Sequence, residues 1–104
     1  MDTATLFTAL ADPTRRALYE RLAQGEQTVH ALTAQAGISQ PAVSKHLAVL
    51  KAAGLVTDRR SGRESHYSLH PQGLAPLRDW MRHQDELWAR SLDRLEDLLN
   101  RMDQ

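Results

Sequence analysis

The polar side chains between Ser39 and Leu55 have the types and spacing that could recognise a nucleic acid. Val43, Leu47 and Leu50 recur at helical spacing and define one apolar stripe. The opposite face is small, polar and basic, with Gln40, Ser44, Lys45, Ala48 and Lys51. No acidic residue occurs in this stretch. Amide, hydroxyl and ammonium groups on one helix face can contact base edges and phosphates in a groove, although an ordinary solvated face has a similar composition.

A second basic group follows shortly after this helix. Arg59, Arg60 and Arg63 lie close to Ser61-Gly62, a turn dipeptide between two short runs that alternate in polarity. This pattern predicts a β-hairpin over residues 55–70 with the three arginines near its tip. Like charges this close repel one another, and a polyanion would offset that repulsion. The alternative is a charged edge that prevents one sheet from pairing with another.

Helix start and stop signals predict which elements position these groups. A first helix capped near Thr3 is expected, and a second one begins at Asp12-Pro13. Thr28 is the predicted cap of a third helix and Ser39 that of the fourth, with a short link through Gly37. The spacing of Leu6, Phe7 and Leu10 makes the first helix amphipathic, and Ala17, Leu18 and Leu22 share one stripe of the second. In the third helix, Val29, Leu32 and Ala36 are expected to point inward. Two short helices joined in this way are typical of a helix-turn-helix over about residues 28–54.

A long helix is predicted for about residues 74–102. Its apolar side chains recur at steps near three and four: Leu74, Leu77, Met81, Trp88, Leu95, Leu98 and Met102, with Trp80, Leu87, Leu92 and Leu99 beside them and Gln84 and Ser91 in the same stripe. At 1.5 Å per residue the helix would be roughly 43 Å long, too long to be buried by a domain of this size. We therefore expect it to pack on the same helix of a second subunit; folding back on its own subunit is the alternative.

Composition excludes several classes of protein. The 104 residues fit a single domain with zero formal net charge, yet residues 38–70 carry five Lys or Arg against two acids, whereas residues 71–104 carry five Arg against seven acids. Cysteine is absent, which excludes disulfides and thiol-based sensing. No apolar run reaches the roughly 18 residues of a membrane span. No Gly-rich phosphate loop or paired base and nucleophile is present, so we expect neither an enzyme nor a cofactor.

Several motifs together resemble the ArsR/SmtB family of dimeric bacterial winged-helix transcriptional repressors. They are ADPTRRALYERLAQGE, GISQPAVSKHL from Gly37 to Leu47, AGLV at Ala53 to Val56, and the Arg-rich hairpin with SHYSL. The resemblance covers about residues 4–100. It implies a mainly α fold with a small β-hairpin (α+β), in the order of four helices, two strands and a fifth helix, as one winged helix-turn-helix domain over residues 1–104.

The resemblance also implies a role for individual residues. The fourth helix would enter the major groove, and the hairpin would be the wing that contacts the DNA backbone or minor groove. The residues implied to contact DNA are Ser39, Gln40, Pro41, Ser44, Lys45, His46, Arg59, Arg60 and Arg63; for His46, a half-buried structural role is an equal alternative. The first and last helices would form the dimer interface through Leu6, Phe7, Leu10, Leu77, Trp80, Met81, Gln84, Trp88, Leu92 and Leu95.

The sequence departs from the family at its metal sites. Many members sense metals through cysteines on the third helix, where this chain reads TVHAL. A second family site uses Asp and His on the last helix; Asp79 and His83 are the nearest counterparts here, but the tighter Asp-x-His pairing is missing. The resemblance is therefore to the cysteine-free branch of the family.

The sequence thus predicts a regulator, most simply a repressor, that binds an inverted repeat in double-stranded DNA as a homodimer in the bacterial cytoplasm, at the nucleoid when DNA-bound. One alternative is the same switch gated by a metal, small molecule or protein effector at the dimer interface. Another is a winged-helix protein-interaction module that no longer binds DNA.

Overall fold

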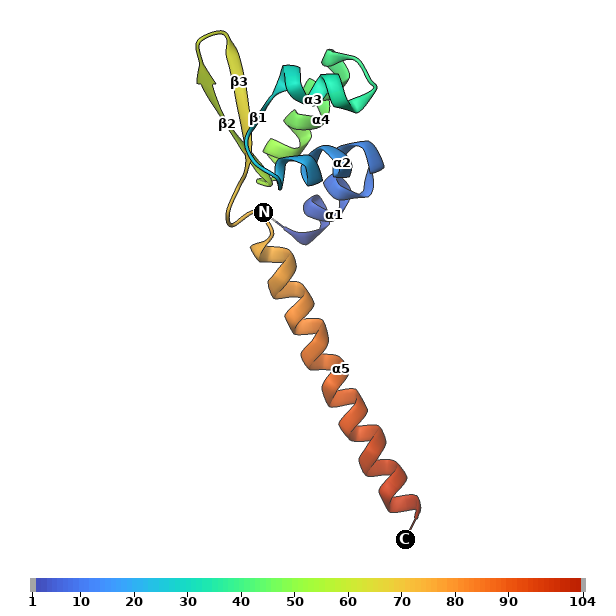
Figure 1. Ribbon diagram of the computed structural model, residues 1–104. Coiled ribbons are helices and arrows are strands. Elements are labelled where there is room, and N and C mark those ends of the chain that lie inside the picture. Colours follow the sequence, from blue (N-terminus) through green and yellow to red (C-terminus); the bar gives the residue numbers. More distant parts are fainter. Residues whose placement is uncertain (1, 104) are drawn as a thin grey trace. The chain divides into compact units, whose positions relative to one another are not determined.

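The computed structural model describes residues 2–103, which fall into two compact units with a boundary between Leu74 and Ala75. The first unit contains α1 (Thr3–Ala11), α2 (Pro13–Leu22), β1 (Gln27–Thr28), α3 (Val29–Ala36), α4 (Gln40–Ala52), β2 (Val56–Ser61) and β3 (Glu64–Leu69), and the second is α5 (Ala75–Met102) (Figure 1). All five expected helices and the hairpin are present, so the predicted fold class is confirmed.

Side-chain caps begin the first four helices. Asp12, Thr28 and Ser39 each accept a hydrogen bond from the backbone N–H three residues later, as the sequence predicts. The first helix is capped by Asp2, whose Oδ1 lies 2.8 Å from the Thr5 nitrogen, one residue before the expected position. Gly37 then takes a left-handed φ of 71° between α3 and α4, a conformation that suits glycine because it has no Cβ. Local chemistry therefore sets where the helices of the helix-turn-helix begin and end.

A small leucine-rich core holds the first unit together. The buried apolar side chains in this unit are Leu6, Ala9, Leu18, Leu22, Leu32, Val43, Leu47, Leu50, Ala53, Leu55 and Val56. Ala17 lies on the predicted stripe of α2 but is exposed, and Leu18 and Leu22 alone carry the buried face of this helix. The apolar stripe of α4 is buried as predicted, and its other face is therefore left for solvent or a partner.

The hairpin belongs to a three-stranded antiparallel sheet in the order β1-β3-β2. Thr28 pairs with His66 and Gln27 with Tyr67, so the hairpin is attached to the segment just before α3. The sequence does not predict β1, because a two-residue strand has no periodicity of its own and forms only when a distant strand offers hydrogen-bond partners. In Figure 1, β2 and β3 extend past the end of this short strand. They form the predicted wing.

Gly73 lies where the chain after β3 passes very close to the end of α4. A Cβ at this position would be 2.9 Å from the Gly54 carbonyl oxygen and 3.1 Å from the Leu55 Cα. Both atoms belong to the backbone and cannot rotate away. We expect Gly73→Ala to lower the free energy of unfolding by about 1–3 kcal/mol, measured by urea denaturation. Gln72→Ala, an exposed change in the same turn, should have little effect; equal losses would contradict this steric explanation.

The second unit is a single amphipathic helix of 28 residues. Its exposed apolar side chains are Trp80, Met81, Leu87, Trp88, Leu92, Leu95, Leu98, Leu99 and Met102. These residues follow the predicted stripe along nearly the whole helix. No helix within residues 2–103 is both long enough and apolar enough to cross a membrane.

Candidate nucleic-acid interface

The outer face of α4 presents polar side chains to solvent. Gln40 and Pro41 lie in its first turn, and Ser44 and Lys45 follow one turn later; all four are exposed. Ser39 accepts from the Ala42 nitrogen at 3.3 Å, so its hydroxyl is engaged in starting the helix. The face that the sequence predicts for base reading is accessible on a helix fixed by its buried side.

A groove of about 280 Å³ brings this helix face and the wing together. Its lining residues are Thr28, Val29, His30, Gln40, Ser44, Arg60, Arg63, Glu64, Ser65 and Tyr67. Two of the three predicted wing arginines, Arg60 and Arg63, therefore line the same groove as Gln40 and Ser44. Amide, hydroxyl and guanidinium groups around one groove are the donors that base edges and phosphate oxygens accept from.

Strand alternation explains which arginines reach the groove. Arg60 pairs with Ser65, and Asp58 with Tyr67, on the face of the hairpin that also carries buried Val56. Arg59 pairs with His66 and points to the opposite face. There its Nε and Nη2 donate to the two carboxylate oxygens of Glu26, at 3.1 and 2.6 Å. The structure thus separates Arg59 from the two arginines with which the sequence groups it.

Other charged groups on α4 and β2 are paired. The Lys51 ammonium lies 2.8 Å from the Asp58 carboxylate, and this hydrogen bond raises the pKa of Lys51. Burial, reinforced by the nearby Asp58 charge, raises the pKa of the Tyr67 hydroxyl, so Tyr67 is a neutral hydrogen-bonding group at neutral pH. The structure gives Lys45 no ion pair among residues 2–103. The positive groups left to attract an anion are therefore Lys45, Arg60 and Arg63.

Sequence reasoning missed six of the ten residues that line the groove: Thr28, Val29, His30, Glu64, Ser65 and Tyr67. They come from β1, from the start of α3 and from β3, and nothing in their local sequence shows that they face α4. Only the alternation of Ser65, Tyr67 and Leu69 indicates that Tyr67 shares a face with the inner residues of the hairpin. The long-range pairing of β1 with β3 is what brings the start of α3 beside the wing.

His46 is half-buried beside an arginine that closes the end of α1. Arg15 donates from Nε to the Ala9 carbonyl at 2.6 Å and from Nη2 to the Thr8 carbonyl at 3.2 Å. Its Nη1 lies 3.4 Å from the Nδ1 of His46. Arg15 thereby satisfies carbonyls that α1 cannot bond internally. The environment of His46 fits the structural alternative as well as a DNA contact.

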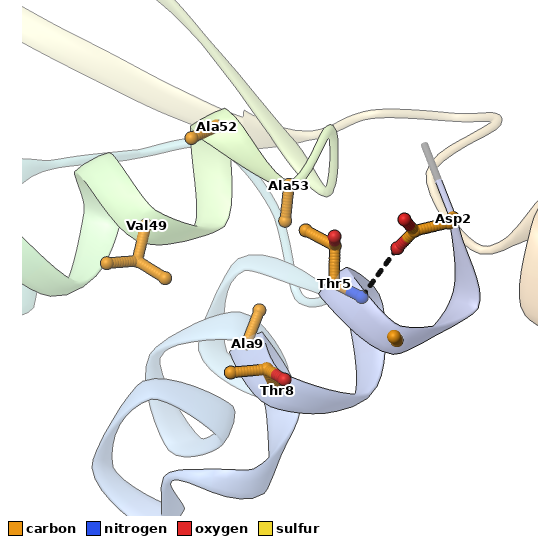
Figure 2. A pocket seen from close by; sticks show the side chains of 8 residues that line it. Asp2, Thr5, Thr8, Ala9, Val49, Ala52 and Ala53 are labelled. Atoms are coloured by element: carbon orange, nitrogen blue, oxygen red, sulfur yellow. Dashed lines mark hydrogen bonds between the residues drawn. The ribbon is translucent and has the colours of Figure 1, made fainter.

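A second hollow, of about 410 Å³, lies between α1 and the C-terminal half of α4 (Figure 2). Its lining is small and mostly apolar: Asp2, Ala4, Thr5, Thr8, Ala9, Val49, Ala52 and Ala53. Figure 2 shows Asp2 at its edge, bonded to the Thr5 nitrogen. The volume falls in the range of small-molecule sites.

The residues expected at a dimer interface differ in their exposure to solvent. Leu6 is fully buried in the core of the first unit, whereas Phe7 is 47% exposed. On α5, Trp80, Met81, Gln84, Trp88, Leu92 and Leu95 are all exposed. The surface that could meet another subunit is therefore mainly the stripe of α5, with Phe7 on α1.

Within one subunit, the structure provides few side chains that could bind a metal ion. Asp79 lies 3.5 Å from the Nη1 of Arg82, and His83 is exposed one turn from Asp79. Among residues 2–103, no three His, Cys, Asp or Glu side chains are grouped to hold a metal ion. Asp79 and His83 could supply two ligands at most from one chain.

Known proteins resemble this architecture along most of the chain. A helix-turn-helix domain family matches residues 10–59. The HTH-type transcriptional regulator Rv2034 of Mycobacterium tuberculosis is 48% identical over 92 residues, covering 88% of this chain and 83% of the relative. An ArsR-like transcriptional regulator from Rhodococcus sp. RHA1 superposes with a TM-score of 0.81 at 29% identity, covering 91% of this chain and 90% of the other.

A third similar protein is the homodimeric winged helix-turn-helix DNA-binding domain Mb0332 from Mycobacterium bovis. Its solution structure matches with a TM-score of 0.65 at 31% identity, over 80% of this chain and 77% of that one. Sequence and fold agree with the resemblance carried by the motifs around α2, α4 and the wing. The chain belongs to the ArsR/SmtB family of winged helix-turn-helix transcriptional regulators.

Proposed function

We propose that this protein is a repressor that binds an inverted-repeat operator as a homodimer. The observation that carries the proposal is the groove in which Gln40 and Ser44 of α4 lie beside Arg60 and Arg63 of the wing. The helix supplies side chains suited to base edges, and the wing supplies cations suited to phosphates. A dimer bound across a promoter would exclude polymerase, in keeping with the repression that the family resemblance implies.

Each residue of the interface has a proposed task. Gln40 and Ser44 read base edges in the major groove, and Lys45 contacts a neighbouring phosphate. Ser39 and Pro41 fix the first turn of α4, where Ser39 can also meet a phosphate. Arg60 and Arg63 hold the DNA backbone or minor groove beside the wing. His46 supports α4 from its half-buried position.

The exposed stripe of α5 supports the dimer. Trp88, Leu92 and Leu95 are between 48% and 66% exposed in the single chain, which is costly for large apolar groups unless a partner covers them. Two copies related by a twofold axis would present their reading helices to half-sites about one helical turn apart. The homodimeric relative Mb0332 has the same kind of fold.

Two substitutions in the groove should separate base reading from backbone attraction. Gln40→Ala should relax the preference at one base pair of each half-site, at a cost of about 1–3 kcal/mol if the amide bonds a base edge at two points. Arg60→Ala should weaken binding to all sequences and lower the salt slope by about one. Fluorescence anisotropy with the protein's own promoter, single-base variants and random duplex, each at several KCl concentrations, measures both effects.

Arg82→Ala is the matched control for charge, because Arg82 is exposed on α5 and paired with Asp79. It should change neither sequence preference nor salt slope. If Gln40→Ala and Arg60→Ala weaken all sequences alike, Gln40 is not the reading residue. If the wild-type dimer shows no preference over random duplex at moderate salt, operator binding itself is wrong, and a protein-interaction module becomes the better explanation.

A small-molecule effector is the second candidate, favoured by the hollow between α1 and α4. One wall of the hollow is the C-terminal end of α4, with Val49 and Ala52 in the helix and Ala53 directly after it. The base-reading residues Gln40 and Ser44 lie at the other end of the same helix. An apolar compound bound in the hollow could therefore shift the reading helix. Ala52→Trp, which would fill the hollow, should abolish any effect of a compound that releases wild-type protein from DNA. The same assay with Zn²⁺ and with chelator tests the metal-gated version at Asp79 and His83.

A further inference from the structure

The Glu26 carboxylate joins both long strands of the wing to the segment that leads into β1. On β2, Arg59 donates to Glu26 through Nε and Nη2, at 3.1 Å and 2.6 Å. On β3, the Ser68 hydroxyl donates to Oε2 of the same carboxylate at 3.0 Å. Glu26 directly precedes β1, which pairs with β3. One side chain therefore connects all three strands of the sheet.

These contacts lie on the hairpin face that points away from the DNA-binding groove. Arg59 pairs with His66, and the neighbouring pair of Thr57 with Ser68 has its side chains on the same face. Arg60 pairs with Ser65 on the opposite face and lines the groove. Glu26 consequently cannot act as a direct DNA contact of that groove, and Arg59 points away from it.

The geometry is stronger than that of an ordinary surface ion pair. An isolated exposed pair contributes little, but a two-point guanidinium–carboxylate contact within a larger network is the recognised exception. His66 adds to the network, with Nδ1 3.6 Å from the Glu26 Oε1 and Nε2 3.9 Å from the Glu64 Oε2. The Arg59 and Ser68 hydrogen bonds lower the pKa of Glu26, so the carboxylate is charged at neutral pH.

We propose that Glu26 is a positioning residue for DNA binding: with Arg59 and Ser68 it holds the wing at the angle that presents Arg60 and Arg63 beside α4. The expected effect on DNA binding rests on the proposed function. The clamp itself, which is Glu26 with Arg59 and Ser68, can be tested without DNA. The proposal assigns Arg59 to the clamp rather than to DNA. It also means that DNA binding needs the acidic side chain of Glu26, although a negative charge by itself would repel DNA.

The first experiment measures amide hydrogen exchange in Glu26→Gln and in the wild-type protein without DNA. Glutamine keeps the shape of the side chain but removes the charge that pairs with Arg59. We expect faster exchange in β1, β2 and β3, with unchanged protection at Leu18 and Leu47 in the helical core. Unchanged exchange in the wing would show that Glu26 does not hold the strands, and would overturn the clamp whatever the protein does with DNA.

The second experiment compares DNA affinity and salt slope for Glu26→Gln, Arg59→Gln and the double variant. The clamp predicts about fivefold weaker binding in each single variant, no further loss in the double variant, and no rise in salt slope. Simple electrostatics predicts otherwise: Glu26→Gln binds more tightly, Arg59→Gln more weakly, and the double variant resembles the wild type. That second pattern, or a salt slope that rises by about one in Glu26→Gln, would overturn the proposal and make Arg59 a phosphate contact that Glu26 restrains.

Glu86→Gln is the matched control, because it removes the same charge at an exposed position on α5, outside the groove and the wing, where Glu86 has no ion pair among residues 2–103. It should leave DNA binding unchanged. If Glu86→Gln weakens binding as much as Glu26→Gln, the effect is not that of the clamp, and the proposal is wrong. If neither the wild type nor any variant binds DNA specifically, the proposed function fails, while the exchange experiment still decides whether Glu26 positions the wing.

Discussion

Leu92→Glu combined with Leu95→Glu is expected to convert the protein into monomers and to weaken operator binding about 100-fold or more. Both leucines are about half exposed on α5, at 48% and 51%, in the middle of the apolar stripe. Carboxylates there would have to be buried without a partner if two stripes met, which is strongly unfavourable. A monomer carries one reading helix, so it loses the gain in effective concentration that a second linked half-site provides.

Analytical ultracentrifugation and anisotropy on one-site and two-site DNA measure the two parts of this prediction. The one-site affinity should change little, because α4 and the wing lie outside the altered helix. Ala89→Glu with Asn100→Glu is the matched control: it adds the same charge on the polar face of α5 and should leave the dimer intact. A variant that stays dimeric with both leucines changed would mean that the stripe is covered in another way, for instance by its own subunit.

The parts of the structure that could be predicted are those that depend on neighbouring residues. Asp12, Thr28 and Ser39 cap helices as expected because each hydroxyl or carboxylate bonds a backbone N–H only three residues away. The turn at Ser61-Gly62 likewise joins the two strands of the wing. Such interactions need no knowledge of the tertiary fold, which is why they can be recognised in a sequence.

The parts that could not be predicted depend on residues far apart in the chain. The sequence groups Arg59 with Arg60 and Arg63 by proximity, but strand alternation places it on the other face, beside Glu26 from 33 positions earlier. Nothing next to Arg15 in the sequence shows that its side chain closes the end of α1 and approaches His46. In both cases the partner of the arginine is decided by how the elements pack.

Leu47→Ala is expected to lower the free energy of unfolding by about 2–5 kcal/mol, a large share of the stability of a small domain. Leu47 is fully buried on the inner face of α4, one turn from Val43 and opposite the side chains proposed to read DNA. Truncation leaves a cavity under the reading helix that the surrounding leucines can fill only in part. Urea denaturation at a fixed protein concentration measures the loss, since a dimer's stability depends on concentration.

Val49→Ala separates burial from a general effect of shortening side chains on α4. Val49 lies two residues further along the same helix and is 40% exposed, so its truncation should cost less than about 1 kcal/mol. The Leu47→Ala variant should still prefer the wild-type operator bases at protein concentrations and temperatures where it remains folded, because Gln40 and Ser44 are unchanged. Equal destabilisation by the two substitutions would contradict the assignment of Leu47 to the core that holds the reading helix in place.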